Sequence, residues 1–292
     1  ALYQPTREIA ATMRKMLIDE AAQQLDTSSE NLTISNSVIS SQTDPSLSKT
    51  FGEIIADKAD EWVIPDETIA LKSNDDFQYI GQPLQRVDFR DKLTGRAVYG
   101  YDARMDGMLY GAVARPPRIG ARLKSASVGT ADTQPGVVEV VILDNFAGVV
   151  AEHRSQAYAA LAFLELEWEG GTTVSQQDIL DMVTVQSEGG TLIQRAGDVP
   201  NNINNGRQIT SEYRSPMAVH AHLEPQAALV SVEDDGVTVQ VATQHPGLTQ
   251  SAIATALEID ASTVHIVPTY LGGGFGRKMG TDVGVEAAYL SR

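Results

Sequence analysis

Apolar residues recur at helical spacing in several parts of the chain and alternate with polar residues in others. Residues 5–25 carry apolar side chains three or four positions apart, which predicts a helix. Short apolar or alternating runs predict strands, and residues 32–34 and 37–39 are expected to form a hairpin. The remaining predicted helices are 51–60, 155–163, 248–257 and 281–290, and the remaining predicted strands are 97–101, 108–114, 137–143, 147–151, 164–169 and 262–270.

Two polar segments interrupt these patterns. Residues 74–88, which include Pro83, are the best candidate for a linker between domains. Residues 172–207 are rich in Asn and Gln and are expected to run over the surface as a long connection. The mixture of helices and strands on either side predicts an α+β fold.

Composition limits the classes of function. The 292 residues are 42% hydrophobic, which is enough for one large core or two to three smaller ones. A net charge of −16 argues against a nucleic-acid partner, and no apolar run is long enough to predict a membrane span. Without cysteine the chain holds neither disulfides nor thiolate-bound iron–sulfur clusters, and it is compatible with either the periplasm or the cytoplasm.

The run Leu271-Gly-Gly-Gly-Phe-Gly-Arg-Lys278 carries the clearest functional signal. Glycine backbone can approach a ligand closely, and a predicted strand precedes the run while a predicted helix follows it, as in many anion-binding loops. Arg277 follows the last glycine, so the run is not a phosphate-binding P-loop. Arg277 also occupies the sixth position of the dinucleotide fingerprint, where glycine is needed. A tight turn that only joins strand to helix is the alternative.

The order of segments around this loop resembles the molybdenum hydroxylases, the xanthine dehydrogenase and aldehyde oxidase family. In that family a Thr-Gln segment, here Thr243-Gln244, precedes a Gly-Gly-Gly-Phe-Gly loop. Residues 213–227 resemble the segment that opens the family's molybdopterin-binding domain, and residues 88–109 resemble its α/β hammerhead domain. Short segments between residues 14 and 72 are similar to the beta-subunit class typified by isoquinoline 1-oxidoreductase.

The resemblance implies a domain organisation. The expected fold is α+β, with an α/β hammerhead domain inserted into part of a molybdopterin-binding domain. Residues 1–75 would form the N-terminal part of a permuted molybdopterin-binding domain, residues 76–185 the hammerhead, and residues 186–292 the first part of the main cofactor domain.

The resemblance also implies a cofactor and a reaction. The cofactor is molybdopterin with molybdenum, and the cytosine dinucleotide form is left open. The reaction is hydroxylation of an aldehyde or N-heterocycle with oxygen from water. A purine is disfavoured because Met279 stands where purine-oxidising members carry Glu. The cofactor-binding residues would be Gln244, Gly273, Gly274, Phe275, Gly276 and Arg277, with Gln244 and Phe275 in the vicinity of molybdenum.

Several parts of such an enzyme are expected outside this chain. The family's general-base glutamate lies in a Gly-x-Gly-Glu motif that does not occur in these residues, so no catalytic residue is assigned here. The expected partners are the remainder of the molybdopterin subunit, a subunit that carries [2Fe-2S] clusters, and an electron acceptor such as a cytochrome or flavin subunit. The alternative is a non-catalytic scaffold or binding module that keeps the fold without metal.

Some residues have competing interpretations. The segment with His220, His222 and Glu224 is also predicted to be a strand, on which all three side chains would share one face and resemble the ligands of a non-haem iron or zinc site. Internal hydrogen bonding of these residues is the simpler explanation. Gln244 could be an internally satisfied amide and Phe275 a core residue. The cations of Arg277 and Lys278 could pair with cofactor phosphates or lie in solvent.

Overall fold

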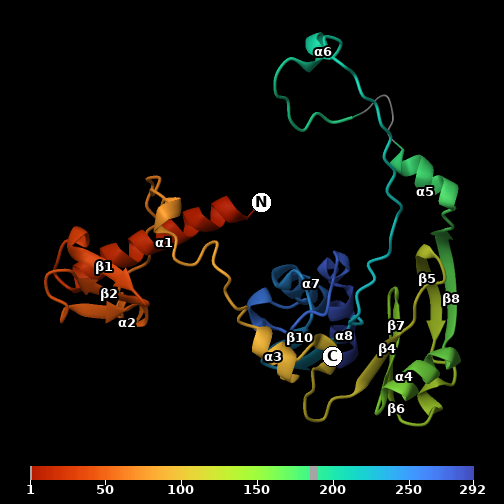
Figure 1. Ribbon diagram of the computed structural model, residues 1–292. Coiled ribbons are helices and arrows are strands. Elements are labelled where there is room, and N and C mark those ends of the chain that lie inside the picture. The colour runs from red at the N-terminus through yellow and green to blue at the C-terminus, as the bar shows by residue number, and fades with distance from the viewer. Residues whose placement is uncertain (1, 185–189) are drawn as a thin grey trace. The chain divides into compact units, whose positions relative to one another are not determined.

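The computed structural model describes residues 2–184 and 190–292, and the chain divides into two units, residues 1–86 and 87–292 (Figure 1). Helices and sheets occur in both units, so the predicted α+β class is confirmed at that level. Among the described residues, no helix is long and apolar enough to cross a membrane.

The first unit consists of two helices packed on a small sheet. Helix α1 (Tyr3–Gln24) and helix α2 (Phe51–Ala56) cover the antiparallel strands β1 (Leu32–Ser35), β2 (Val38–Ser41) and β3 (Ser48–Thr50). The buried side chains that join these elements are Ile18, Ala21, Ala22, Leu32, Ile39 and Ile54. The predicted first helix and hairpin are confirmed, whereas the second helix ends four residues earlier than the predicted Asp60.

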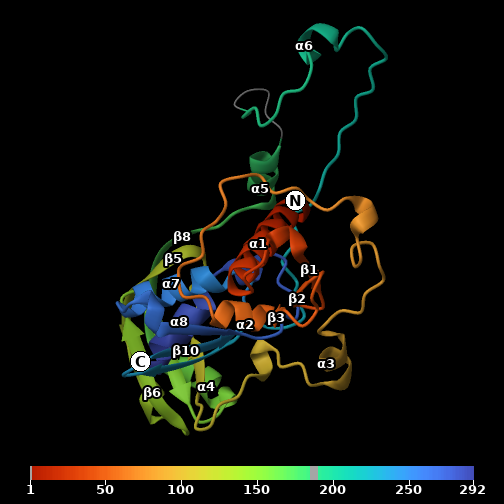
Figure 2. The same cartoon turned by 90° about the vertical axis from the view of Figure 1, so that its left-hand side faces the viewer.

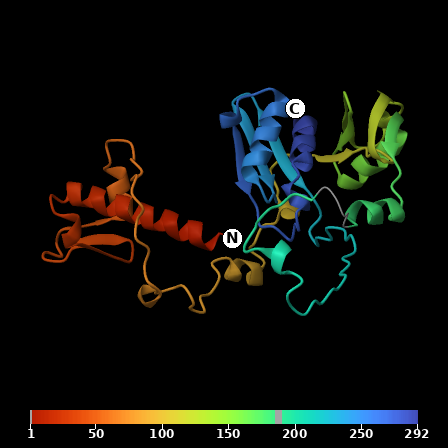
Figure 3. The same ribbon diagram turned by 90° about the horizontal axis from the view of Figure 1, so that it is seen from above.

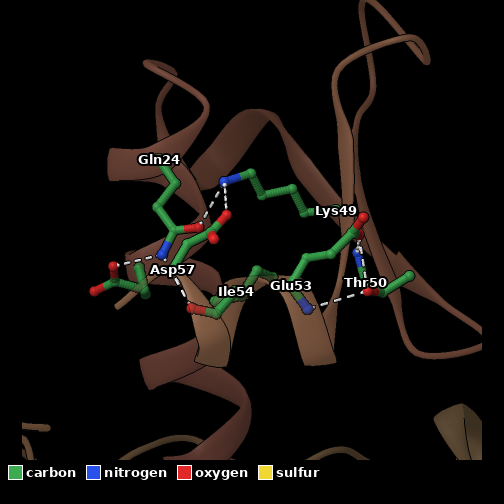
Figure 4. A network of polar contacts seen from close by, with 7 residues as sticks. Gln24, Lys49, Thr50, Glu53, Ile54 and Asp57 are labelled. Carbon is green, nitrogen blue, oxygen red and sulfur yellow. Dashed lines mark hydrogen bonds and ion pairs between the residues drawn. The ribbon is translucent and has the colours of Figure 1, made fainter. Parts of the chain in front are cut away.

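A polar network ties together the C-terminal ends of the two helices in this unit (Figure 4). Lys49 Nζ donates to Gln24 Oε1 and Asp57 Oδ2, each at 2.9 Å, and Gln24 Nε2 donates to the carbonyl of Ile54 at 3.0 Å. Thr50 caps α2 reciprocally with Glu53, whose pKa is lowered by the hydrogen bond from the Thr50 amide. The network fixes how α2 meets α1 without relying on a large core.

The second unit begins with short elements and an antiparallel region. Helix α3 (Phe89–Thr94) precedes the strands β4 (Tyr110–Val113), β6 (Val137–Leu143) and β7 (Phe146–Ala151), which form a sheet in the order β4-β7-β6. Strands β5 (Ile119–Ser127) and β8 (Glu165–Thr172) form a separate two-stranded ribbon, and helix α4 (Arg154–Ala160) packs beside β4 and β7 (Figures 1 and 2). Small buried residues, Ala112, Ala151 and Ala157, allow α4 to lie close to the sheet.

The chain between this region and the last sheet contains little regular structure. Helix α5 (Gln176–Val183) and the short helix α6 (Val199–Asn202) are its only helices among the described residues. Residues 203–227, all of which the structure describes, contain neither helix nor strand. The predicted long connection is therefore confirmed, and it continues for some twenty residues past its expected end at Arg207.

Residues 228–292 form a sheet covered by two helices. Strands β9 (Ala228–Glu233), β10 (Gly236–Val241) and β11 (Val264–Pro268) lie in the order β11-β10-β9, and helices α7 (Pro246–Leu257) and α8 (Asp282–Ser291) pack against them (Figure 3). Alternate residues of β10 point into the core, as period-two geometry requires. The core consists of Val237, Val239, Val241, Ile253, Ala254, Leu257, Val264 and Ala288.

Helix α8 also contacts the middle sheet. Its Leu290 side chain fills the space above Gly111 and Gly148, where a methyl group at either glycine would collide with it. The ring of Tyr289 meets that of Phe146 edge-on with centroids 5.2 Å apart, and Glu286 forms an ion pair with Arg115. One helix thus packs on both the last sheet and the β4-β7-β6 sheet.

Two predicted strands are absent. Residues 97–101 form a 3-10 turn at Gly100–Asp102, with a single parallel bridge between Tyr99 and Tyr270. The stretch that contains His220, His222 and Glu224 is irregular. Conversely, β5 was not predicted, because its sequence lacks a clear alternation of apolar and polar residues, and β3, β9 and β10 were also not predicted.

Candidate functional site

Parallel pairing of β10 and β11 brings Gln244 and the glycine loop to one edge of the last sheet. Helix α7 connects the two strands, and Val241 at the end of β10 lies opposite Pro268 at the end of β11. Parallel strands present their carboxyl ends at the same edge, so the segments that follow them meet there. The backbone amide of Gln244 donates to the carbonyl of Lys278 at 2.9 Å, which joins the two segments directly.

The local sequence starts and ends α7 at the positions that this geometry needs. Pro246 occupies the first turn, and the His245 ring nitrogen accepts from the Leu248 amide at 3.2 Å. The helix ends at Leu257, and its C-cap residue Glu258 adopts the left-handed conformation with φ of 59°. Gln244 therefore lies between the end of β10 and the N-terminal cap of α7, on backbone held at both sides.

The side chain of Gln244 has a fixed orientation. Its Oε1 accepts a hydrogen bond from the Gly276 amide at 3.0 Å, which only the oxygen of the amide group can do. Within residues 2–184 and 190–292 its Nε2 has no hydrogen-bond partner, and the residue is exposed. The prediction of an internally satisfied amide therefore holds for the oxygen, whereas the two N–H donors remain available.

The glycine loop has an unusual backbone. Gly273, Phe275 and Gly276 have positive φ values of 93°, 51° and 99°. For Phe275 this left-handed conformation costs about 1–3 kcal/mol, yet its ring is 69% exposed and gains no core packing in return. The interpretation of Phe275 as a core residue is therefore wrong for this unit. Left-handed residues next to right-handed ones turn successive amides toward one side, which creates a concavity suited to anions.

Gly274 is required by its contact with Gln244. A Cβ at position 274 would lie within 2.9 Å of Gln244 Cδ and closer still to its oxygen. The absence of a side chain at Gly274 thus lets the amide of Gln244 reach across the loop to Gly276.

A buried ion pair lies beneath the loop. Lys278 Nζ is 2.5 Å from Glu224 Oε2, and the two side chains are only 2% and 7% exposed. The same carboxylate oxygen accepts from the Gly272 amide at 2.7 Å. Both predictions for Lys278, a phosphate contact or a solvated charge, are wrong because the ammonium group is shielded and paired.

Arg277 forms a more open ion pair. Its guanidinium donates to both carboxylate oxygens of Asp282 at 3.0 and 2.7 Å, and each side chain is 39% exposed. The hydrogen bonds from Arg277 lower the pKa of Asp282. This pair holds Arg277 at the start of α8 with part of the guanidinium still accessible.

The two histidines do not form the predicted facial set with Glu224. His222 Nδ1 is 2.6 Å from the Glu224 carbonyl oxygen, and His220 lies near Gly276, with Nε2 3.5 Å from where its Cβ would be. In the part of the chain that the structure describes, no group of three His, Cys, Asp or Glu side chains is placed to hold a metal ion. The non-haem iron or zinc hypothesis therefore finds no geometric support there.

The segment before β4 also meets this edge. Tyr270, directly ahead of the loop, donates its amide to the Val98 carbonyl at 3.0 Å, and its ring lies 6.0 Å from that of Tyr99. A Cβ at Gly100 would approach the Ala242 amide nitrogen to 2.9 Å. Residues 98–100 thus pack against the base of the site. No local sequence pattern indicated this contact.

Together these residues form a site that suits an anionic ligand with hydrogen-bond acceptors. Gln244 provides two N–H donors, and the loop provides backbone amides of glycines, which no side chain of their own covers. Arg277 provides a partly accessible cation. One buried acceptor, Glu224 Oε1, has no partner among the described residues, so an additional donor would be accommodated there. This donor and acceptor set fits a pterin cofactor, which carries an anionic tail and both N–H and oxygen groups.

Known proteins are similar to this chain over most of its length. Residues 185–292 match the family model described as "Molybdopterin cofactor-binding domain". The chain is 31% identical to one subunit of nicotinate dehydrogenase from Pseudomonas putida over 99% of this chain and 25% of that protein. It is 30% identical to the beta subunit of isoquinoline 1-oxidoreductase from Brevundimonas diminuta over 77% of this chain and 30% of that protein. The chain thus spans about a quarter to a third of these relatives.

Solved structures share the fold. The crystal structure of quinoline 2-oxidoreductase from Pseudomonas putida 86 matches 72% of this chain and 33% of that one, with a TM-score of 0.54 and 20% identity. Aldehyde oxidoreductase from Desulfovibrio gigas matches 71% of this chain and 29% of that one, with a TM-score of 0.53 and 21% identity.

Proposed function

Because this chain belongs to the molybdenum hydroxylase family, we propose that it forms part of a molybdopterin-binding subunit of a multi-subunit oxidoreductase. The enzyme would oxidise an aldehyde or an N-heterocycle with water as the source of oxygen. Molybdopterin, when bound, supplies the redox chemistry that this reaction needs. The observation that carries the proposal is the orientation of Gln244, whose oxygen is held by Gly276 and whose N–H donors are available.

The role proposed for Gln244 is to donate a hydrogen bond to an acceptor atom of the bound cofactor. A preorganised donor is more effective than a mobile one because it does not need to reorganise when charge develops at the acceptor. The Gly276 amide provides that preorganisation through a 3.0 Å bond, and the Lys278 carbonyl fixes the Gln244 backbone.

The glycine loop is proposed to hold the cofactor by its backbone. Gly273, Gly274 and Gly276 would let the cofactor approach the amides closely, and the exposed ring of Phe275 would shield one side of it from water. Arg277 would contact a phosphate group, since its pair with Asp282 uses only part of its five donors. Whether that phosphate belongs to molybdopterin itself or to its cytosine dinucleotide form does not change this contact.

The domain organisation is part of the proposal. Residues 76–185 would be the α/β hammerhead domain, residues 1–75 the N-terminal part of a permuted molybdopterin-binding domain, and residues 186–292 the first part of the main one. The match of residues 185–292 to the cofactor-binding family model supports the last of these boundaries.

Other polypeptide segments would complete the enzyme. The chain has no cysteine for an iron–sulfur cluster, so a partner subunit would carry the [2Fe-2S] centres and pass electrons to a cytochrome or flavin acceptor. The general-base glutamate and most remaining cofactor contacts would come from the remainder of the molybdopterin subunit. Met279, 49% exposed directly after the loop, offers no carboxylate to grip a purine, which favours the other substrates.

The test uses the full-length subunit purified with its partner subunits. Molybdenum and pterin analysis should find about one cofactor in each molybdopterin subunit. Gln244→Ala should keep the metal but lower kcat by about a hundredfold to a thousandfold, the range seen when one preorganised donor is removed. Gln250→Ala is the matched control, because that amide donates to the Val264 carbonyl at 2.9 Å, at the opposite end of β11 from the loop, and should leave kcat unchanged.

Two outcomes would contradict the proposal. Wild-type complex without molybdenum or pterin would favour the scaffold alternative. Equal kcat values for Gln244→Ala and the wild type, in protein that holds the metal, would show that the cofactor site lies elsewhere.

A further inference from the structure

The ion pair between Glu224 and Lys278 connects three segments that are distant in sequence. The two residues lie 54 positions apart. Glu224 belongs to the irregular segment before β9, and its Oε2 receives both Lys278 Nζ at 2.5 Å and the Gly272 amide at 2.7 Å. The Glu224 amide in turn donates to the Gly272 carbonyl at 3.2 Å. The first residues of the glycine loop are therefore bonded to Glu224 through backbone and side chain together.

Lys278 holds the other half of the site through its backbone. Its carbonyl accepts from the Gln244 amide at 2.9 Å and from the Thr243 hydroxyl at 3.2 Å. The side chain of Lys278 thus forms an ion pair with Glu224, while its backbone carbonyl accepts hydrogen bonds from the segment that contains Gln244. A shift of this one residue would move Gln244 relative to Gly272 and Gly276.

A buried ion pair is not expected to be present for its contribution to stability alone. Taking two charges out of water costs several kcal/mol for each, and apolar residues of similar volume would often stabilise a fold as well. Gly272 shows how closely the pair is fitted, because a Cβ there would lie 2.5 Å from Glu224 Cβ. A charged pair gives directional bonds that an apolar pair would lack, and here all of them end on the loop.

We infer that Glu224 and Lys278 are positioning residues, which set the spacing between the glycine loop and Gln244 so that both contact one cofactor. This inference rests on the proposed function, and neither residue is given a chemical step. The pair acts below the loop, whereas Gln244 and the loop amides face the ligand.

The experiment compares variants of the full-length complex by hydrogen exchange and by molybdenum content per folded protein. Lys278→Met removes the charge while keeping the length of the side chain, and it leaves the Glu224 carboxylate buried and unpaired. Amide exchange across residues 271–279 should rise about a hundredfold, and molybdenum content should fall at least about fivefold. Lys278→Arg keeps the positive charge, and it should partly restore both the slow amide exchange and the molybdenum content.

Lys58→Met is the matched control. Lys58 pairs with Glu20 at 2.8 Å, and these side chains are also well shielded, at 14% and 10% exposure, but they lie in the first unit. The control should lower stability locally without changing exchange in residues 271–279 or the molybdenum content. A loss of metal of equal size in Lys58→Met and Lys278→Met would reduce the pair to a general stabilising role and overturn the inference.

The double variant Glu224→Leu/Lys278→Met covers the case in which the single variant fails to fold. Replacing both charges removes the unpaired buried group while still deleting the acceptor of the Gly272 amide. The expected result is a folded complex with fast exchange in the loop and low molybdenum content. A folded double variant with wild-type exchange and full molybdenum content would overturn the inference. Wild-type complex without molybdenum would instead refute the proposed function, and the exchange data would still test the pair.

Discussion

The glycine loop and the segment of residues 203–223 are both irregular, yet they differ in how their chain is held. Lys278 in the loop is 2% exposed, and Gly272, Gly274 and Gly276 are each fixed by a contact with Glu224 or Gln244. In the other segment, Leu223 is 98% exposed and Tyr213 91% exposed. The loop follows β11, which pairs in parallel with the buried strand β10, whereas no described strand pairs with residues 203–223. The conformation of the irregular loop is therefore fixed by contacts with residues from other elements, and not by its own sequence.

The change from exposed chain to chain that is held by contacts occurs at Glu224. Its neighbours His220 and Leu223 are exposed, whereas Glu224 is buried because Lys278 and Gly272 supply partners for its carboxylate. A buried carboxylate without such partners would be strongly destabilising. The large apolar side chains that are exposed between residues 203 and 223 are Ile203, Ile209, Tyr213, Met217, Val219 and Leu223.

The largest expected difference is between the core of the last sheet, on which the loop is anchored, and the exposed segment of residues 203–223. Ile253→Ala should lower the free energy of unfolding by about 2–5 kcal/mol, since Ile253 is fully buried between β10 and α8. Leu223→Ala should change it by less than about 0.5 kcal/mol, because that side chain packs on nothing in the described chain. Chemical denaturation followed by circular dichroism measures both, and similar losses would mean that the segment around Leu223 is packed in solution.

A second comparison uses two glycines and gives a smaller effect. Gly274→Ala should push the Gln244 side chain off the loop and lower kcat/KM of the full-length complex by about tenfold to a hundredfold. Gly206→Ala is the matched control, because nothing lies within 4 Å of its Cβ position and its φ is not positive. Steady-state kinetics on an aldehyde or N-heterocycle substrate tests the pair, and equal activity of the two variants would contradict the contact described for Gly274.

The smallest effect concerns the open ion pair at the start of α8. Hydrogen bonds from Arg277 lower the pKa of Asp282 below its ordinary value of 3.8, so the folded state favours the charged carboxylate. The resulting stability is present above pH 3.8 and is lost as the pH falls through the lower folded value. Because the pair is partly exposed, Asp282→Asn should cost less than about 1 kcal/mol at pH 7, and this cost should become progressively smaller as the pH falls from 3.8 toward 2. Unfolding curves of wild type and variant between these pH values measure the difference, and a constant gap would contradict it.

Sequence patterns predicted most helices because their apolar spacing is local. The predicted helices at 5–25 and 281–290 appear as α1 and α8 with ends shifted by one or two residues. The strand predicted through His220 and Glu224 failed because period-two alternation also occurs in chain that has no partner strand. A strand needs a neighbour to pair with, and that neighbour is not encoded in the same few residues.

The sequence by itself determined the glycine loop and the motifs of the family, and the resemblance that these motifs carry implied that Gln244 and Phe275 lie near one cofactor. The parallel pairing of β10 with β11, which brings Gln244 to the loop, was decided by the tertiary structure, because β10 was not predicted from its sequence. Only the tertiary structure decided that Lys278 is buried against Glu224, that Gln244 turns its oxygen inward, and that Gly100 backs the site. Each of these depends on which distant residue comes within about 3 Å, and a one-dimensional pattern does not contain that distance.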